Sequence, residues 1–250
     1  QEVTDPSAFV KFKQKDSDEY FLAWTTTPWT LPANKMLAVN PEMEYGLYEV
    51  GDEKYIVATK LADKVFIDDK LGKDGAAGVV EQRLLKKFKG SDLAGLEYVD
   101  LLDDGKTHKV YAADFVGEED GTGIVHIAPA YGEDDYDLYL EHQDEAEFED
   151  VLDENGYYLP ETAEKLYALG MRDTDENGIQ IWAGNKFIAK VFEAAGIIYK
   201  IAYIKHEYPF NPRSKQRIMY RAFPSWFFDV AGQKKMMLDQ NENINWFPEH

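Results

Sequence analysis

The chain contains no cysteine, so it can form neither a disulfide framework nor a thiolate zinc site, and an intracellular origin is favoured. It has no apolar run near the length of about 18 residues that is needed to cross a bilayer, and no signal-peptide pattern. We therefore expect no membrane contact. The chain opens at Gln1 rather than at a methionine, which indicates a piece excised from a longer protein.

Basic residues are scarce, with 27 Lys and Arg against 47 Asp and Glu and a net charge of −20. This balance argues against nonspecific binding of nucleic acid, which needs clustered positive charge. Residues 133–154 carry twelve acidic side chains and no Lys or Arg, whereas 200–221 carry six basic residues and one Glu. If any face meets a phosphate backbone, it is built from Lys200, Lys205, Arg213, Lys215, Arg217 and Arg221. The competing interpretation is a solvated pair of strands with scattered charge.

Signatures of metal and nucleotide binding are also missing. The five histidines lie at 108, 126, 142, 206 and 250, with no helical His-x-x-x-His spacing, so we expect no metal site and no cofactor. Gly121-Thr-Gly123 is too short for a phosphate-binding loop, and no Gly-Lys-Ser/Thr follows it.

Many short strand patterns are present, at 8–13, 20–25, 35–39, 44–50, 54–59, 96–102, 107–116 and 122–127. Helices are predicted at 60–70, 79–88, 133–147, 161–169 and 184–196, with a Gly-rich loop at 72–78 and an extended tail from 197 to 230. The alternation of strands with a few helices predicts a mixed β/α fold. Its core would be a closed or nearly closed β-barrel of short strands with inserted helices.

Two polar patches interrupt this apolar pattern. Thr25, Thr26 and Thr27 follow an apolar strand directly, and Pro28 then forces the chain out of the ladder, so the hydroxyls lie at a rim. The second patch runs from Gly121 to Asp135. We expect the two patches to form two walls of one small pocket.

The chemistry of these patches leaves alternatives open. Asp135 could pair with a ligand ammonium, but acidic residues in a first helical turn usually only offset the helix dipole. His126 shares a strand face with Ile124, where a lone histidine is more often a satisfied core residue than a catalyst. Thr25, His126 and Asp135 supply the atom types of a nucleophilic triad, yet no nucleophile elbow accompanies them. What remains is a pocket suited to binding a polar ester and positioning water.

Two motifs carry a family resemblance. Trp24-Thr-Thr-Thr-Pro-Trp-Thr-Leu-Pro-Ala-Asn34 and Gly121-Thr-Gly-Ile-Val-His-Ile-Ala-Pro-Ala-Tyr-Gly-Glu-Asp-Asp-Tyr136 closely resemble the editing (CP1) insertion of isoleucyl-tRNA synthetase, a class I aminoacyl-tRNA synthetase. The opening and closing segments look like that family too, so the resemblance brackets the chain. The His-Ile-Gly-His and Lys-Met-Ser-Lys-Ser signatures of the synthetic module are absent. One departure lies at 206–214, where the family often has Cys and Trp.

The resemblance implies an organisation and an activity. Residues 1–200 would form the editing barrel with its helical insertions, and 201–250 an extended return segment toward the synthetic core. An insertion leaves and re-enters one host domain, so the chain ends should lie near one another. The implied activity is post-transfer hydrolysis of valine mischarged onto isoleucine tRNA by a positioned water without metal, with pre-transfer editing left open. A catalytically inert module that only binds the acceptor end, and an unrelated metal-independent esterase, are the alternatives.

The resemblance also implies roles for individual residues. Asp135 would pair with the α-ammonium, and His126 would stand in the side-chain wall and exclude the larger substrate. Thr25, Thr26 and Thr27 would bind the terminal adenosine and ester, with Thr27 and Asn34 closest to the attacking water. Trp29 and Tyr131 would be further walls. The partners would be the charged 3′ end of the isoleucine tRNA and the remainder of the synthetase, in the cytoplasm.

Overall fold

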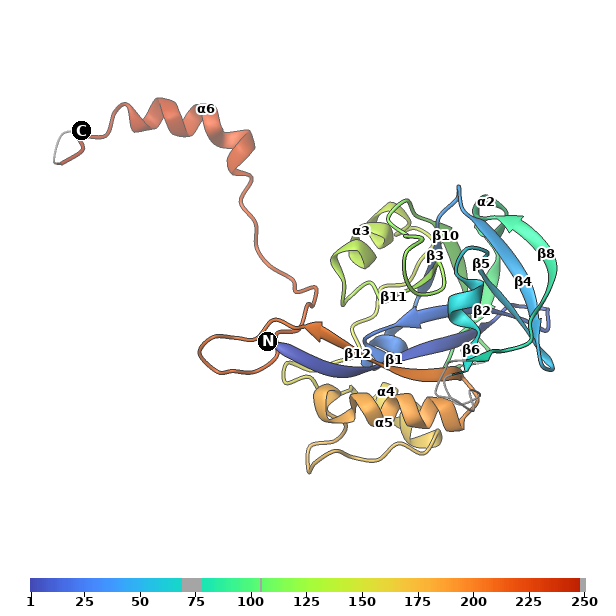
Figure 1. The fold of residues 1–250 in the computed structure, drawn as a ribbon. Helices are drawn as coiled ribbons and strands as arrows, with labels where there is room; N and C mark the ends of the chain where they lie inside the picture. The colour runs from blue at the N-terminus through green and yellow to red at the C-terminus, as the bar shows by residue number, and fades with distance from the viewer. Residues whose placement is uncertain (69–77, 104, 248–250) are drawn as a thin grey trace.

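The computed structural model describes residues 1–250 except 69–77, 104 and 248–250, and it shows a mixed β/α fold (Figure 1). The strands are β1 (Glu2–Lys13), β2 (Glu19–Thr25), β3 (Met36–Val39), β4 (Glu44–Val50), β5 (Glu53–Ala58), β6 (Ile67–Asp68), β7 (Gly78–Val79), β8 (Arg83–Lys89), β9 (Glu97–Val99), β10 (Thr107–Ala112), β11 (Ile124–Ile127) and β12 (Ile198–Glu207). The helices are the 3-10 helix η1 (Pro28–Ala33) and the α-helices α1 (Ala62–Val65), α2 (Gly90–Leu93), α3 (Glu133–Glu141), α4 (Pro160–Ala168), α5 (Ile181–Ala194) and α6 (Val230–Asn241).

Two sheets carry the fold. The larger has the strand order β12-β1-β2-β5-β4-β8, and the smaller has the order β11-β3-β10-β9. Side chains alternate across a strand, so Ala8, Val10 and Phe12 share one face of β1, where they join Leu37 and Val110 of the smaller sheet in one buried cluster. The helices α4 and α5 cover the opposite side of β1 and β12 (Figure 1).

The smaller sheet has a second buried face. Met36, Ala38, Tyr111 and Ile127 point away from the larger sheet and pack with Leu138 of α3. The helix α3 therefore lies against the back of β11 and β3. This packing fixes the N-terminal turn of α3, which carries Asp135, at the end of β11.

The prediction of a mixed β/α fold is confirmed, but the described strands form open sheets rather than a closed barrel. The strand β2 pairs with β5 only over Glu19–Phe21, and its ladder with β1 ends at Thr25. Pro28 has no N–H to extend that ladder, and η1 carries the chain across to β3 in the other sheet. The chain thus changes sheets at the threonines instead of closing one sheet upon itself.

The helix predicted at 79–88 is wrong. Arg83–Lys89 form β8, which pairs antiparallel with β4 and lies at the edge of the larger sheet. Leucine and lysine favour helices when isolated, but the free edge of β4 offers a row of unpaired backbone groups, and this pairing decides the outcome. The helix predicted at 60–70 is reduced to α1 within the described residues, and most of the loop predicted at 72–78 lies outside them.

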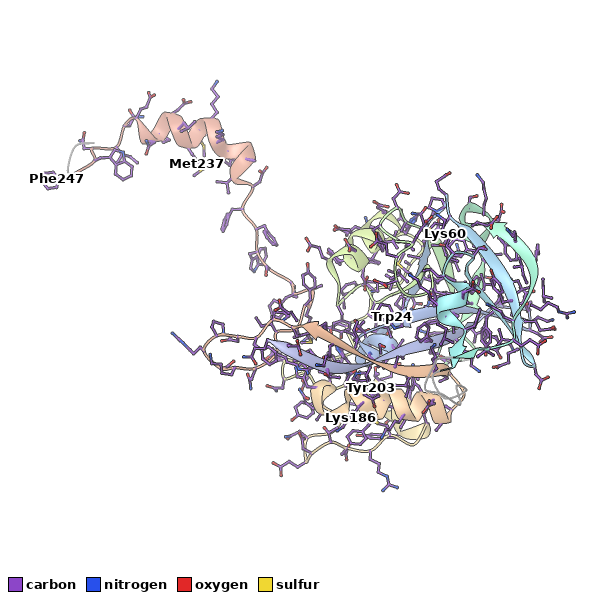
Figure 2. All side chains as sticks on the ribbon, in the orientation of Figure 1. Trp24, Lys60, Lys186, Tyr203, Met237 and Phe247 are labelled. Carbon is purple, nitrogen blue, oxygen red and sulfur yellow. The ribbon has the colours of Figure 1, made fainter. Side chains whose placement is uncertain are left out.

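The C-terminal part separates into two portions. The strand β12 pairs with β1 along most of its length, so the boundary predicted between 200 and 201 falls inside a strand of the larger sheet. The helix α6 has no buried residue, and Met237 and Phe247 lie away from the sheets (Figure 2). The N-terminal ammonium donates to the carbonyl of Tyr208, 3.1 Å away. The predicted proximity of the chain ends therefore holds where the chain leaves the sheet but not at its last described residues.

Candidate functional site

The threonine loop is closed on itself by hydrogen bonds between hydroxyls and backbone. Thr27 donates its N–H to Oγ1 of Thr25 at 3.1 Å, and the Oγ1 atoms of Thr27 and Thr30 are 3.3 Å apart. Thr30 in turn donates its hydroxyl to the carbonyl of Thr27 at 2.8 Å. Thr25 and Thr30 are buried, whereas Thr26 and Thr27 are half-buried at the rim. Of the predicted threonines, Thr26 and Thr27 are thus the more exposed.

His126 joins this loop to β11. Its Nδ1 lies 2.8 Å from the amide nitrogen of Asn34, and its Nε2 lies 3.0 Å from Oγ1 of Thr30. The Asn34 amide nitrogen can only donate, so Nδ1 accepts and the ring proton belongs on Nε2. In that tautomer the Nε2–H group of His126 donates to Oγ1 of Thr30, and the Thr30 hydroxyl donates its own proton to the carbonyl of Thr27. Burial lowers the pKa of His126 to about 3, so the ring is neutral near pH 7.

Asn34 is the centre of the same network. Tyr98 donates its hydroxyl to Oδ1 at 2.6 Å, and the amide nitrogen donates to the carbonyl of Met36 at 2.9 Å as well as facing His126. Asn34 is 3 % exposed and His126 is 7 % exposed. Both residues therefore brace the loop from within the protein, and their predicted contacts with water and substrate stay predictions. Nothing in the sequence singles out Tyr98 or Thr30 as members of this network.

Asp135 occupies the other patch. Its Oδ2 accepts the backbone N–H of Ala128 at 3.0 Å, which holds the carboxylate at the end of β11, two residues beyond His126. Burial, with a smaller contribution from the charge of Asp134, raises the pKa of Asp135 to about 6. Among the described residues no hydrogen bond reaches Oδ1, and the side chain is partly exposed. Gly132 leaves space for the carboxylate, because a Cβ there would lie 2.8 Å from its Cγ.

The predicted walls Trp29 and Tyr131 lie together. Their rings meet edge to face with centroids 5.3 Å apart, and both side chains are buried. Two residues of the helical part hold the Trp29 backbone: Asn185 of α5 accepts its N–H at 3.1 Å, and Tyr158 donates its hydroxyl to its carbonyl. Because Pro28 has no N–H, the N–H of Trp29 is the first backbone donor of η1, and Asn185 caps it. No local sequence pattern around Thr27 predicts a capping residue so far along the chain.

A cavity of about 550 Å³ lies between Trp24 and the segment that leads into β11, and no residue from Thr25 to Thr30 lines it. Trp24 forms one side, next to Thr25, and residues 116–125 form the other, including Val125 beside His126. The rim carries Glu118, Glu119 and Asp120, which suits an uncharged ring better than a phosphate. The sequence motifs include Trp24 but do not indicate that it lines a cavity, and they leave out the acidic residues Glu118, Glu119 and Asp120.

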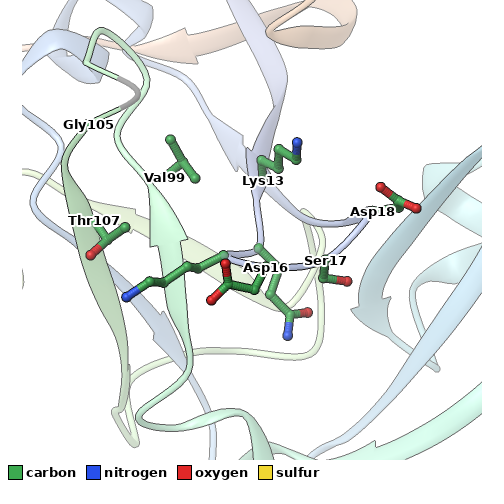
Figure 3. A pocket seen from close by; sticks show the side chains of 9 residues that line it. Lys13, Asp16, Ser17, Asp18, Val99, Gly105 and Thr107 are labelled. Atoms are coloured by element: carbon green, nitrogen blue, oxygen red, sulfur yellow. The ribbon is translucent and has the colours of Figure 1, made fainter.

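Another cavity, of about 580 Å³, lies at the turn between β1 and β2 (Figure 3). Lys13, Asp16, Asp18 and Thr107 line it together with their neighbours. It sits at the start of β2, whereas the threonines sit at its end, so this cavity is separate from the candidate site.

Most basic residues of the 200–221 segment are bound to the protein itself. Lys205 pairs with Glu2, Arg217 with Asp5, and Arg221 with Asp150. Lys200 donates to the carbonyls of Val65 and Ile67. These contacts favour the interpretation as a paired strand region over a dedicated phosphate face.

No group of three or more His, Asp or Glu residues is arranged to hold a metal ion within the described part of the chain. Nor does any described helix have the length and apolar character needed to span a membrane.

Solved structures share this fold. A structure described as GlLeuRS-CP1 superposes with a TM-score of 0.56, covering 76% of this chain and 81% of that chain at 16% identity. The editing domain of the P. knowlesi cytosolic leucyl-tRNA synthetase gives a TM-score of 0.51, with 80% and 97% coverage at 16% identity. No protein-family model matches the chain. The fold is thus that of the editing domain of a class I aminoacyl-tRNA synthetase.

Sequence relatives narrow this class to one family. The isoleucine–tRNA ligase of Picrophilus torridus is 38% identical over 253 residues, which covers 99% of this chain, and that of Thermotoga petrophila is 35% identical over 247 residues. The chain belongs to the isoleucyl-tRNA synthetase family, as its editing-domain segment. It spans 22% of the length of the Picrophilus relative.

The buried, neutral His126 has a consequence for stability against acid. Its pKa is near 6.5 in the unfolded chain and about 3 in the folded one, so the unfolded state binds the proton first as the pH falls. The stabilisation is complete above pH 6.5 and is lost progressively toward pH 3. We expect His126→Gln to flatten the loss of unfolding free energy between pH 6.5 and 4, measured by urea denaturation.

Asp135 opposes this trend, because its raised pKa gives stability that is lost as the pH rises from 3.8 toward 6. The comparison with His126→Gln isolates the histidine, since Asp135 is present in both proteins. His142→Gln, a change at the C-terminal end of α3 outside the network, is the matched control. If His126→Gln leaves the pH dependence of the unfolding free energy unchanged, the interpretation of His126 as a buried neutral histidine is contradicted.

Proposed function

We propose that this domain hydrolyses the ester of valine mischarged onto the isoleucine tRNA. A pocket fitted to isoleucine rejects valine weakly, because one methylene is worth only about 1–3 kcal/mol, a limit already known for isoleucyl-tRNA synthetases themselves. A second site that is too small for isoleucine then removes the error. The observation that carries the proposal is the partly exposed Asp135 carboxylate, held by Oδ2 at the end of β11, the strand whose His126 is bonded to the threonine loop.

The residues suggest how the reaction proceeds. Ionised Asp135 binds the α-ammonium, and the terminal adenosine lies toward Thr26 and the cavity beside Trp24. The half-buried Thr27 hydroxyl orients the attacking water at the ester carbonyl, with Asn34 and His126 fixing the loop that holds it. Oriented hydroxyls and the tRNA ribose hydroxyl suffice for an activated ester, so the reaction needs no metal and no covalent intermediate.

The proposed partners are the charged 3′ end of the isoleucine tRNA and the remainder of the synthetase chain, in the cytoplasm. The exposed apolar residues of the return segment support the second partner. Trp226, Phe227 and Phe228 precede α6, and each is at least 89 % exposed. A run of bare aromatic side chains of this kind marks a surface that another part of a protein covers.

The test is a deacylation assay with three esters of the isoleucine tRNA, carrying valine, isoleucine or N-acetylvaline. We expect valine to be released about 100-fold faster than either of the others, in the 1–250 chain and in the full-length enzyme, with no effect of EDTA. Binding of the acceptor end without release of valine would favour the inert module. Equal cleavage of the N-acetylated ester would favour a general esterase. The same assay with valyl-adenylate decides whether pre-transfer editing shares the site.

A further inference from the structure

Arg221 binds the return segment to residues 150–153 through all three nitrogens of its guanidinium. Its Nε and Nη2 donate to Oδ2 of Asp150 at 3.0 and 2.7 Å, and Nη1 and Nη2 donate to the carbonyls of Asp153 and Leu152. The next residue, Ala222, donates its N–H to the carbonyl of Ala130 at 2.8 Å. Charge-assisted, forked bonds of this kind fix both the position and the orientation of the carboxylate.

The anchored carboxylate orients Tyr131. Its Oδ1 accepts the Tyr131 hydroxyl at 2.7 Å, and that hydroxyl accepts the N–H of Val151 at 2.9 Å. Burial, together with the bond to Asp150, raises the pKa of Tyr131 far above its ordinary value, so the hydroxyl stays a donor. The Tyr131 ring is therefore held at its polar end, while the ring itself meets Trp29 edge to face.

Trp29 transmits this contact to the threonine loop. It follows Pro28 directly, and the carbonyl of Thr27 accepts both the N–H and the hydroxyl of Thr30 one turn later. The Trp29 ring and the Thr27 carbonyl therefore belong to one turn of chain, whose backbone Asn185 and Tyr158 also hold at Trp29. A misplacement of about 1 Å in a catalytic group can cost about 100-fold in rate.

We propose that Arg221 is a positioning residue for the editing reaction, acting through Asp150, Tyr131 and Trp29 on the threonine loop. This inference rests on the proposed function. It gives the return segment, where the chain leads toward the rest of the synthetase, a direct influence on hydrolysis. The alternative role for Arg221 is a plain positive charge that attracts tRNA phosphates.

Arg213 supplies a matched control. It lies eight residues earlier in an exposed position, and its backbone N–H donates to Oδ1 of Asn211, in the loop after β12 rather than beside the threonine loop. Arg217 is not independent of the site, because its guanidinium lies over the Trp182 ring, which meets Trp29 edge to face. Arg213→Gln and Arg221→Gln remove the same charge from the same segment. Only Arg221→Gln frees Asp150 and Tyr131.

The experiment is single-turnover release of valine from the isoleucine tRNA by the full-length enzyme at varied enzyme concentration. We expect Arg221→Gln to lower the maximal rate about 10-fold while leaving the half-saturating concentration within about twofold. Arg213→Gln should leave the maximal rate within about twofold. Tyr131→Phe combined with Arg221→Gln should cost less than the product of the two separate effects. Equal losses for the two arginines, seen as a raised half-saturating concentration, would overturn the proposal.

A second readout does not depend on activity. In protein labelled with 5-fluorotryptophan, the ¹⁹F resonance of Trp29, assigned with Trp29→Phe, should shift in Arg221→Gln and much less in Arg213→Gln. If the unmodified enzyme releases no valine, the proposed function fails while this spectrum still decides the positioning role. An unmoved Trp29 resonance would overturn it. If Arg221→Gln does not fold, Arg221→Lys, which keeps the charge but loses the fork, takes its place in both measurements.

Discussion

Replacement of Asp135 by alanine is expected to lower kcat/KM for valine release about 100-fold, because the α-ammonium loses its only predicted anionic partner. The fold should survive, since the change removes one bond to Ala128 and also removes a partly buried carboxylate whose pKa is raised. The measurement is deacylation kinetics, with circular dichroism to confirm folding. Asp134→Ala is the control, because Asp134 is exposed in the same helical turn and carries the same charge.

The pH dependence gives an independent check of the same residue. Asp135 binds an ammonium only when ionised, and its pKa is raised to about 6, so kcat/KM should fall about tenfold per pH unit below pH 6. In Asp135→Ala the residual kcat/KM should no longer fall in this way below pH 6. The buried His126, with a pKa of about 3, contributes nothing in this range. If Asp135→Ala hydrolyses the ester at the normal rate and still loses activity below pH 6, Asp135 does not bind the substrate.

Replacement of Asn34 by alanine is expected to destabilise the fold by about 3 kcal/mol. The change leaves three buried groups without their hydrogen bond to Asn34: the Tyr98 hydroxyl, the Nδ1 atom of His126 and the carbonyl of Met36. Unfolding in urea measures the effect. Tyr98→Phe removes only one of these bonds and should cost about 1 kcal/mol, and the two changes together should cost less than their sum.

The same variant separates the two roles of Asn34. If Asn34 only braces the loop, the rate of valine release should recover at temperatures where Asn34→Ala is fully folded. If its amide also orients the attacking water, the rate should stay low in the folded variant. A loss of stability below about 1 kcal/mol would contradict the buried network itself.

Long-range partners are the part of the site that sequence reasoning could not supply. The motifs around Thr25 and Asp135 were evident, because runs of hydroxyls and carboxylates beside apolar strands are unusual. Tyr98, Tyr158 and Asn185 belong to ordinary amphipathic patterns, and each reaches the site only because distant elements pack there. A burial pattern shows that a side chain faces inward but not which atom it will meet.

The sequence alone determined the family, the mixed β/α class, most strand positions and the two polar patches, because these follow from local residue order. The tertiary structure decided that β8 is a strand, that the sheets stay open, and that His126 is a neutral brace within the core. The physical reason is that pairing at a free sheet edge, desolvation of an imidazole and capping of η1 by α5 all depend on groups far apart in the chain.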